Sequence, residues 1–443
     1  MSKRASTTLA DELVRVCKPV DNCRRIWVAF SGGLDSAVLL HALSCYVQTL
    51  PKTARPELCA VHVNHGLSPN AMQWQQHCQE AAAALGITCV ALSVVLENDG
   101  RGVEAEARHK RYSAISNQLI AGDLLVTGHH ADDQVETVLF RLLRGSGPAG
   151  LAGMQRRVNI YGCEVFRPLL SLPRQVLEEY ANEYGLSWVE DESNEEQRYS
   201  RNYLRHSVVP TLASRWPGYR ESVMRSADWC READDLLQGY ALQDLKAILQ
   251  VSRWGEWLPL ASLRELTTPK CKLVIGAWCR AVGVSLPRAI DWKQIIAAVK
   301  GEATGCCFDG GEYCFQLFAS GLYLVDNAVS EAVDDFSYVV DKLPFTAELP
   351  QGVFSIESKV LLDTSSWRVT NRRGGERCRP LARQGGRSVK KLLQEAGVPP
   401  WFRQTVPLLY AGEQLIAVAD LYLCEGGVEG FDMQQLECLW CLQ

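Results

Sequence analysis

The sequence has no surplus of basic residues. Its 443 residues include 46 Lys and Arg against 51 Asp and Glu, which gives a formal net charge of −5. A protein that binds nucleic acid over its whole surface is usually basic, so this balance argues against that class. A disordered chain and a disulfide-stapled mini-protein are also excluded, because 47% of the residues are hydrophobic and the chain is long enough for several domains.

Long uncharged apolar runs are missing too, and residues 1–11 contain no apolar segment. We therefore expect no membrane partner, no secretory signal and a cytoplasmic location. The seventeen cysteines are scattered through apolar runs, as at Cys45, Cys59, Cys89 and Cys163. This distribution predicts buried free thiols in a reducing compartment.

Histidine is absent after position 206. All eight histidines fall at or before it, so side chains that titrate near neutral pH are concentrated in the N-terminal half. In this half, strands are predicted over residues 26–30, 58–63, 88–96 and 124–127, and helices over 37–50, 72–85, 103–119 and 132–143. The alternation predicts an α/β fold with βαβ crossovers and a doubly wound parallel sheet that carries helices on both faces.

The pattern changes near residue 217. The pattern is helical from about residue 221 to 300 and is Gly/Cys-rich and β-leaning from there to residue 323. From about residue 341, short strands surround one predicted helix at 389–395. We therefore predict three domains, which are a parallel-sheet catalytic domain over 1–217, a mainly helical domain over 218–335 and a small basic α+β domain over 336–443.

The strongest motif is the loop Ser31-Gly32-Gly33-Leu34-Asp35-Ser36, which directly follows a predicted strand and precedes a helix. Two glycines let the backbone approach an anion, and the helix start offers free N–H groups to phosphate oxygens. Asp35 can hold Mg²⁺ against a pyrophosphate. The structural alternative is a strand-to-helix turn with Ser36 as the N-cap. No Gly-Lys-Ser/Thr follows, so the loop is not a Walker A motif.

This loop resembles that of the PP-loop (N-type) ATP pyrophosphatase superfamily. The resemblance implies a doubly wound PP-loop ATPase domain that uses ATP and Mg²⁺, cleaves ATP between its α- and β-phosphates and adenylates a carbonyl oxygen. His62 follows the second predicted strand, where the adenine of ATP would lie. A packed loop histidine is an equal alternative for this position.

A second motif, Gly128-His129-His130-Ala131-Asp132-Asp133-Gln134-Val135-Glu136-Thr137, lies at the end of the fourth predicted strand and opens a helix. Open α/β sheets bind ligands at this edge. Asp133 and Glu136 are three residues apart, so they share a helix face. The helix dipole alone explains one or two carboxylates in a first turn, but not two histidines together with three acids.

The two motifs together resemble the tRNA(Ile)-lysidine synthetase family. Further matching stretches are Val61 to Leu67, Val103 to Tyr112, Arg167 to Leu170, Trp188 to Asn194 and Arg201 to Arg205. The resemblance is dense over residues 24–210 and returns at 371–377 and 390–394. One departure is Gly375-Glu376, where the family leads us to expect Gly-Asp.

The resemblance implies that the chain joins free L-lysine to C2 of the wobble cytidine in the isoleucine tRNA with a CAU anticodon. ATP first adenylates the C2 oxygen, and the lysine ε-amine then attacks C2 and expels AMP. Deprotonating that amine at pH 7 costs roughly 4.6 kcal/mol, and an acidic cluster can seat the cation and accept the proton. The expected catalytic residues are Asp133 as the base, Asp35 and His129; the expected lysine-binding residues are Asp133, Glu136, Arg108 and Arg201. Phosphate contacts or plain surface ion pairs are the alternatives for the two arginines.

The third predicted domain concentrates positive charge. Residues 368–403 carry ten basic and two acidic side chains, a local balance of +8. We expect this segment to bind tRNA outside the anticodon, at the acceptor stem, through phosphate contacts. The residues expected to do so are Arg372, Arg373, Arg377, Arg387, Lys390 and Lys391. The expected partners are therefore this tRNA, free L-lysine and, in a homodimer, a second copy of the chain.

Three alternatives remain open at this point. A tRNA thiolase of the same superfamily would need reactive cysteines, and those near the motifs lie in apolar elements. A glutamine-dependent synthetase is less consistent, because no amidotransferase domain precedes the loop. A non-catalytic module that binds ATP or RNA would keep its RNA function after Asp35→Ala and Asp133→Ala.

Overall fold

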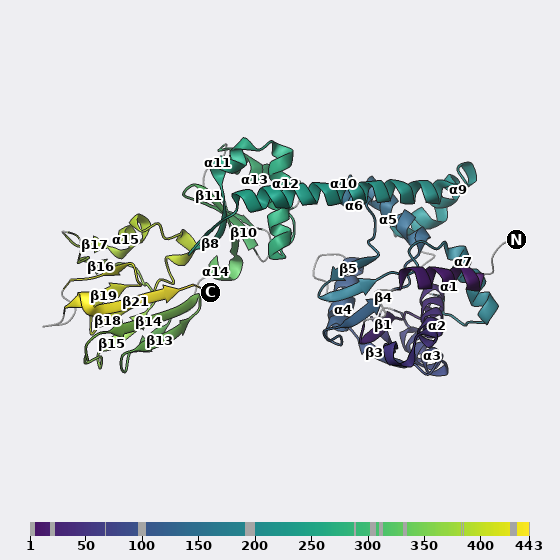
Figure 1. Ribbon diagram of the computed structural model, residues 1–443, viewed down its shortest axis with the longest axis horizontal. Coiled ribbons are helices and arrows are strands. Elements are labelled where there is room, and N and C mark those ends of the chain that lie inside the picture. Colours follow the sequence, from purple (N-terminus) through teal and green to yellow (C-terminus); the bar gives the residue numbers. More distant parts are fainter. Residues whose placement is uncertain are drawn as a thin grey trace. The chain divides into compact units, whose positions relative to one another are not determined.

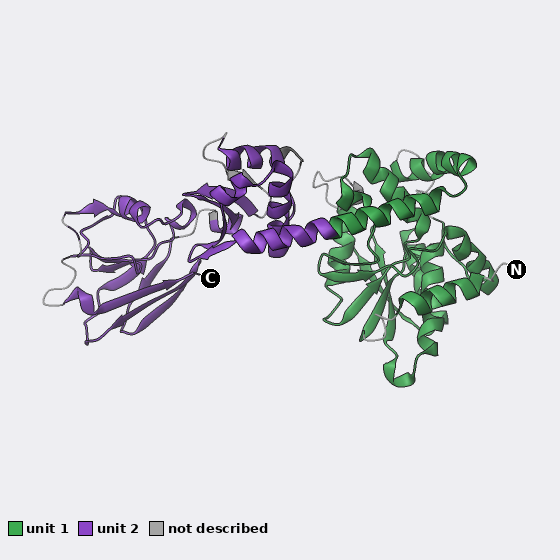
Figure 2. Ribbon diagram, turned by 45° about the horizontal axis from the view of Figure 1, so that its top comes forward, with its two compact units in different colours: residues 1–235 green, residues 236–443 purple. Residues whose placement is uncertain are grey.

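The structure is a computed structural model that describes residues 5–17, 23–66, 68–95, 103–190, 200–287, 289–301, 307–309, 313–330, 335–381, 383, 385–425 and 432–442. The chain forms two compact units, residues 1–235 and 236–443 (Figures 1 and 2). Their boundary falls inside the long helix α10 (Tyr219–Ile248). The predicted third domain lies within the second unit, which contains three hydrophobic clusters, so the division into three domains stays a prediction.

The first unit contains a six-stranded sheet in the order β3-β2-β1-β4-β6-β5. Its strands are β1 (Arg25–Ala29), β2 (Glu57–Asn64), β3 (Thr88–Ser93), β4 (Asp123–Val126), β5 (Arg157–Ile160) and β6 (Cys163–Phe166). Every neighbouring pair is parallel except the β5–β6 hairpin. The predicted doubly wound parallel sheet is therefore confirmed.

Helices cover both faces of this sheet (Figure 1). They are α1 (Ala5–Val16), α2 (Leu34–Thr49), α3 (Ala71–Ala84), α4 (Val103–Ser116), α5 (Ala131–Leu143), α6 (Pro148–Leu151) and α7 (Arg174–Tyr184). Ile26 and Val28 of β1 lie in one hydrophobic core, and Trp27 between them lies in the core on the opposite face. Because both faces are buried, the strands are apolar throughout rather than alternating.

The order of the strands reverses next to β1. The chain passes from β1 to β2 on one side of it, and β4 lies on the other side. The loops that leave the carboxyl ends of β1 and β4 start at this switch point, and doubly wound sheets bind ligands in the crevice at such a point. These two loops carry the two sequence motifs.

A helical segment follows the sheet. It comprises α8 (Ser200–Tyr203), a π-helical turn (Leu204–Val208), α9 (Val209–Arg215) and α10. The π-helical turn and α8 pack against α5. Although α10 has 30 residues, no helix in the described ranges is both long and apolar enough to cross a membrane.

The first part of the second unit has the predicted helices together with a sheet of short strands. Helices α11 (Leu260–Glu265), α12 (Thr268–Val282), α13 (Ala289–Lys300) and α14 (Asn327–Ser330) accompany a five-stranded antiparallel sheet. Its strands, in spatial order, are β7 (Gln250–Ser252), β8 (Gly255–Pro259), β11 (Gly321–Asp326), β10 (Tyr313–Phe318) and β9 (Cys307–Asp309). These strands are only three to six residues long, so they leave a weak periodic signal.

The C-terminal part has the predicted α+β composition. One sheet joins β12 (Ser337–Val339), β15 (Trp367–Thr370), β18 (Leu408–Ala411), β19 (Gln414–Val418) and β20 (Tyr422–Leu423), and a second joins β13 (Phe345–Leu349), β14 (Gly352–Ser358) and β21 (Leu436–Cys441). The short ladder of β16 (Arg377–Cys378) and β17 (Arg387–Ser388) precedes α15 (Val389–Glu395). Single 3₁₀ turns occur at Lys52–Ala54, Pro400–Phe402 and Met433–Gln435.

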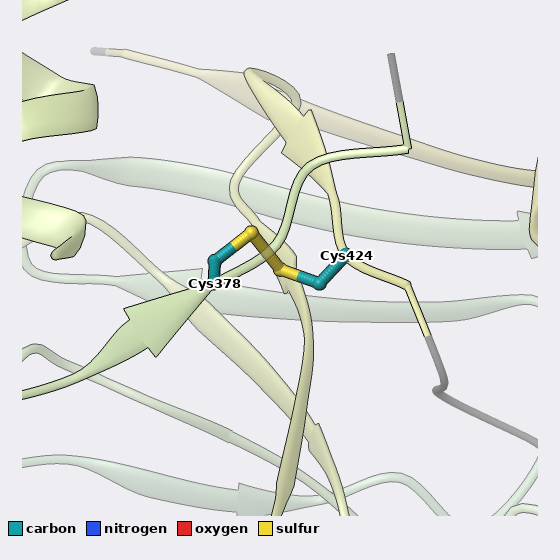
Figure 3. The surroundings of a disulfide bond; sticks show 2 residues. All are labelled: Cys378 and Cys424. Atoms are coloured by element: carbon teal, nitrogen blue, oxygen red, sulfur yellow. A yellow bond between two sulfur atoms is a disulfide. The ribbon is translucent and has the colours of Figure 1, made fainter. Parts of the chain in front are cut away.

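The expectation of free cysteines is wrong at one pair. Cys378, at the end of β16, and Cys424, just after β20, form a disulfide with their Cα atoms 5.5 Å apart (Figure 3). Their separation of 46 residues gave no hint in the sequence that the two strand ends meet. Cys45 is exposed rather than buried, whereas Cys59 and Cys163 are buried free thiols as expected.

Candidate active site

The phosphate-loop motif forms the junction between β1 and α2. Gly33 precedes the first helical residue, and no side chain caps the helix, so its start is open to an anion. Ser36 is the third helical residue rather than the N-cap, and its hydroxyl donates to the carbonyl of Gly33 (2.9 Å). Gly32 has a φ of +88°, which favours glycine, and a Cβ here would lie 2.9 Å from the Sγ of Cys78.

The second motif reaches this loop through Gly128. A Cβ at this position would lie 2.9 Å from the carbonyl oxygen of Asp35 and 3.3 Å from the backbone nitrogen of Ser36. Only glycine therefore allows the β4 loop to lie against the start of α2. The motifs that the sequence singled out separately meet at one point of the crevice.

His130 links the two motifs, although the sequence interpretation gave a role to His129 instead. His130 is 1% exposed, and its Nε2 lies 3.6 Å from Oδ2 of Asp35 and 3.4 Å from Oδ2 of Asp133. Burial would lower the pKa of this imidazole, but the hydrogen bond with Asp35 and the charges of Asp133, Asp35 and Asp132 raise it overall. The sequence feature that could have indicated this role is the position of His130 directly before a helix whose first turns carry three acidic residues.

Asp35 presents one uncommitted oxygen. Its Oδ1 is buried without a hydrogen-bond partner, while Oδ2 faces His130. Burial would raise the pKa of this carboxyl, but the hydrogen bond with His130 and the charges of His130, Arg174 and Arg205 lower it. A bare carboxylate oxygen beside a phosphate loop fits Mg²⁺, which commonly takes one or two carboxylates and completes its shell with phosphates and water. The described residues form no cluster of three or more His, Cys, Asp or Glu side chains that could enclose a metal by itself.

Asp132 is a structural residue. Its Oδ2 accepts the backbone N–H of Arg174 (2.8 Å), and its Oδ1 accepts both Nε (3.0 Å) and Nη2 (2.6 Å) of Arg220. It therefore ties α5 to α7 and α10. The two carboxylates that the sequence assigned to lysine, Asp133 and Glu136, lie elsewhere on the same helix.

Asp133 and Glu136 are brought together, as their spacing predicted, but by a residue that the sequence interpretation left without a role. Arg205 donates from Nε to Oε1 of Glu136 (2.6 Å) and from Nη2 to Oε2 of Glu136 (3.1 Å) and Oδ1 of Asp133 (3.2 Å). Burial raises the pKa of the 4% exposed Glu136, and the hydrogen bond and charge of Arg205 oppose that rise. The sequence feature that could have indicated a role for Arg205 is its position one helical turn after Arg201.

His129 faces a different environment from His130. Its Nδ1 lies 2.8 Å from Oγ1 of Thr127. Burial lowers the pKa of His129 to about 4; the charge of Asp133 opposes this shift, and nearby arginines add to it. The imidazole is therefore neutral at physiological pH, so it can orient a substrate but carries no positive charge of its own.

A group of arginines lies around His129. Those whose charges act on this imidazole are Arg167, Arg108 and Arg201. Arg201 and Arg108 also lower the pKa of Arg141, although burial is the larger cause. Arg167 is 3% exposed and its Nε has no hydrogen-bond partner. The predicted residues Arg108 and Arg201 thus lie near the predicted His129, and Arg141 and Arg167 join them without having been predicted.

His62 is buried beside the loop. Its Nδ1 lies 2.9 Å from the carbonyl of Phe30, the residue before Ser31, and 3.3 Å from the Sγ of Cys78. Burial lowers its pKa. The structure thus places His62 where it supports the end of β1, and contact with ATP stays a prediction. Asp191 to Asn194, part of a stretch that carried the resemblance, lie outside the described residues.

The basic segment of the C-terminal part is more neutralised than its sequence suggests. Six of its eight arginines form ion pairs with acids, three of which lie outside residues 368–403. The pairs are Arg368–Glu413, Arg372–Glu376, Arg373–Asp335, Arg379–Glu425, Arg383–Glu395 and Arg387–Glu395. The Arg372–Glu376 pair is largely buried. The arginines of the other five pairs are more exposed, and such pairs are weak, so phosphate oxygens can replace their carboxylates.

Four basic residues of this segment form no ion pair among the described residues, which are Arg377, Arg403, Lys390 and Lys391. Lys390 and Lys391 are exposed on α15 without an ion pair in the part of the chain that the structure describes. Glu376 accepts the backbone N–H groups of Arg373 (2.5 Å) and Gly374 (2.6 Å). The departure from the expected Gly-Asp thus keeps a carboxylate, which folds the loop onto itself.

Three thiols of the first unit, of which that of Cys78 lies beside Gly32 of the phosphate loop, are unsuited to nucleophilic chemistry. Burial raises the pKa of Cys59 to about 11, that of Cys78 to about 12 and that of Cys89 to about 11. A catalytic cysteine needs a thiolate near neutral pH. These values argue against the thiolase alternative.

Comparison with known proteins agrees with the geometry. A PP-loop domain matches residues 5–212, and a TilS substrate C-terminal domain matches residues 367–440. The chain is 37% identical over 414 residues to the tRNA(Ile)-lysidine synthase of Shigella flexneri, covering 91% of this chain and 94% of that protein. It is also 37% identical over 418 residues to that of Serratia proteamaculans (strain 568), covering 91% and 92%. The chain belongs to the tRNA(Ile)-lysidine synthase family.

Membership of this family confirms the predicted resemblance, the ATP-dependent ligase class and the assignment to tRNA modification. The PP-loop domain implies that the chain uses ATP. A tRNA thiolase from Methanococcus maripaludis is similar in structure with a TM-score of 0.43 and 17% identity, covering 52% of this chain and 79% of that one. A likeness of that size has no bearing on the reaction.

Proposed function

We propose that the chain uses ATP and Mg²⁺ to adenylate the C2 oxygen of the wobble cytidine in the isoleucine tRNA with a CAU anticodon, and then joins free L-lysine to C2. The observation that carries the proposal is the meeting of three features at the β1–β4 crevice. These are the phosphate loop, the contact between Asp35 and His130, and the carboxylates of Asp133 and Glu136. The products are lysidine in tRNA, AMP and pyrophosphate.

The first step takes place at the phosphate loop. The backbone of residues 31–36 and the hydroxyls of Ser31 and Ser36 contact the phosphates of ATP. Asp35, with its bare Oδ1, would hold Mg²⁺, which when bound would supply positive charge against the pyrophosphate. His130 orients the other oxygen of Asp35. His62 borders the adenine side of the loop.

The second step takes place at Asp133. The ε-ammonium of lysine binds this carboxylate and gives it a proton as the amine nitrogen bonds to C2. The bond between C2 and its adenylated oxygen breaks, and AMP leaves with both electrons of that bond. Neutral His129 orients the cytidine, and Arg108 and Arg201 bind the lysine carboxylate. Glu136 acts on the lysine site indirectly, because both of its oxygens already accept from Arg205, which it holds against Asp133.

The C-terminal part binds the tRNA away from the reaction. We assign the acceptor stem to the surface that contains Arg372, Arg373, Arg377 and Arg387 together with the two lysines of α15. A second copy of the chain in a homodimer remains a prediction, which sedimentation equilibrium of the full-length protein tests directly.

The deciding experiment combines the full-length protein with ATP, Mg²⁺, labelled lysine and unmodified isoleucine tRNA carrying CAU. Lysine incorporation that requires both ATP and tRNA is the expected result. Asp35→Ala is expected to abolish AMP release, and Asp133→Ala to abolish lysine incorporation. Tight tRNA binding without incorporation by the unchanged protein would refute the proposal, and unchanged RNA binding by the double variant would then favour a non-catalytic module.

A further inference from the structure

Arg205 donates a hydrogen bond to each of the two carboxylate oxygens of Glu136. Its fork takes Oε1 (2.6 Å) and Oε2 (3.1 Å) of Glu136, and the same Nη2 reaches Oδ1 of Asp133 (3.2 Å). Glu136 is 4% exposed. A buried carboxylate needs such a partner, and removing one member of a buried pair leaves the other charge uncompensated.

The pair is the outer end of a chain of alternating charges. Starting at the phosphate loop, Asp35 contacts His130 (3.6 Å), His130 contacts Asp133 (3.4 Å), and Asp133 contacts Arg205, which binds Glu136. Asp133 is therefore held on both sides, since Oδ2 accepts the backbone N–H of His130 (3.0 Å) and Oδ1 faces Arg205. Its orientation depends on both neighbours.

The backbone places this arginine apart from the other arginines of the site. Arg205 lies in the π-helical turn Leu204–Val208, a rare conformation that is frequent at functional sites. Arg201, on the preceding α8, acts electrostatically on His129 and Arg141. The two arginines of one helical segment thus serve two different parts of the crevice.

We propose that Arg205 is a positioning residue for the lysine-transfer step, which acts by fixing the carboxylate of Asp133 from the side opposite His130 and by neutralising Glu136. The inference rests on the proposed function. Arg205 is not a ligand of lysine in this scheme. Its removal leaves adenylation at the phosphate loop intact but lets Asp133 rotate away from the attacking amine.

The two steps can be measured separately with the full-length protein. Labelled ATP and tRNA without lysine report adenylated tRNA, and labelled lysine added afterwards reports transfer. We expect Arg205→Ala to keep adenylation within about threefold and to slow transfer about 100-fold, which is the cost of displacing a reacting group by about 1 Å. Arg205→Lys keeps the charge without the fork, so it should recover part of the transfer rate.

A matched control lies on α10. Arg220 makes a comparable fork to Asp132, and its side chain is 27% exposed against 29% for Arg205. Arg220→Ala is expected to lower the midpoint of thermal unfolding as much as Arg205→Ala does while leaving the ratio of the two rates unchanged. A purely structural role for Arg205 would make the two variants behave alike.

A second variant keeps the proposal testable if Arg205→Ala fails to fold. Glu136→Gln keeps the shape of the side chain and removes its charge, so it should produce the same selective loss of lysine transfer. The variant that combines Arg205→Ala with Glu136→Gln should transfer lysine no more slowly than the slower of the two single variants. Transfer at the original rate in both single variants, or an equal fall in both steps, would overturn the proposal. An unchanged protein that incorporates no lysine would instead refute the proposed function.

Discussion

At the scale of single residues, the crevice shows how neighbours decide the chemistry of identical side chains. His129 and His130 are adjacent in sequence, yet their pKa values shift in opposite directions. Burial and nearby arginines lower the pKa of His129, whereas the carboxylates of Asp35, Asp133 and Asp132 outweigh burial at His130. One imidazole is therefore a neutral orienting group and the other is part of a charged chain.

The first prediction concerns the titration of His129. Since its pKa is about 4 in the folded protein and near 6.5 when unfolded, the folded state binds fewer protons between these values. His129 then costs no stability above its unfolded pKa and destabilises the fold as pH falls toward 4. In NMR spectra of histidine-labelled full-length protein, the signal that His129→Gln removes should keep its neutral-form shift down to about pH 5. A midpoint near the ordinary value would contradict this.

At the scale of elements, the site depends on how closely the β4 loop approaches the start of α2. Gly128 permits that approach, because its missing Cβ would stand 2.9 Å from the carbonyl oxygen of Asp35. Backbone atoms of both elements are rigidly held by the sheet, so neither can give way without moving the phosphate loop.

Gly128→Ala should therefore impair adenylation specifically. We expect the rate of tRNA-dependent pyrophosphate release to fall about 100-fold, as a displacement of about 1 Å at the reacting groups would cause. Gly147→Ala is the matched control, since nothing lies within 4 Å of a Cβ at that position and its φ is −77°. A normal rate in Gly128→Ala, with circular dichroism showing an intact fold, would mean that the loop tolerates the contact.

Elements of the sheet could be predicted from sequence because their signals are local. The predicted strand 124–127 and helix 132–143 correspond to β4 and α5 within a residue or two, since apolar runs and periodicity are read over short windows. The contacts of the site were less accessible. Arg205 binds Glu136 across 69 residues, and the disulfide spans 46; such pairings depend on the fold rather than on neighbouring residues.

At the scale of the whole molecule, the net charge of the chain does not indicate where positive charge is concentrated. The chain carries −5 overall, yet residues 368–403 carry +8. Acids outside that segment, such as Asp335, Glu413 and Glu425, neutralise several of its arginines. What distinguishes a phosphate-binding surface here is therefore the set of cations that remain unpaired or weakly paired, with Lys390 and Lys391 the clearest members.

The salt dependence of tRNA binding tests this surface. If about five phosphates are neutralised, the logarithm of the binding constant should fall with the logarithm of salt concentration at a slope of roughly −3.5 to −4.5. Replacing both Lys390 and Lys391 by Gln removes two contacts, so the slope should become shallower by about 1.5. Gln at Lys342 and Lys359, both exposed and outside the segment, makes the same change in net charge and should leave the slope unaltered. Equal slopes for the two double variants would show that binding responds to overall charge, and the basic segment would lose its assigned role.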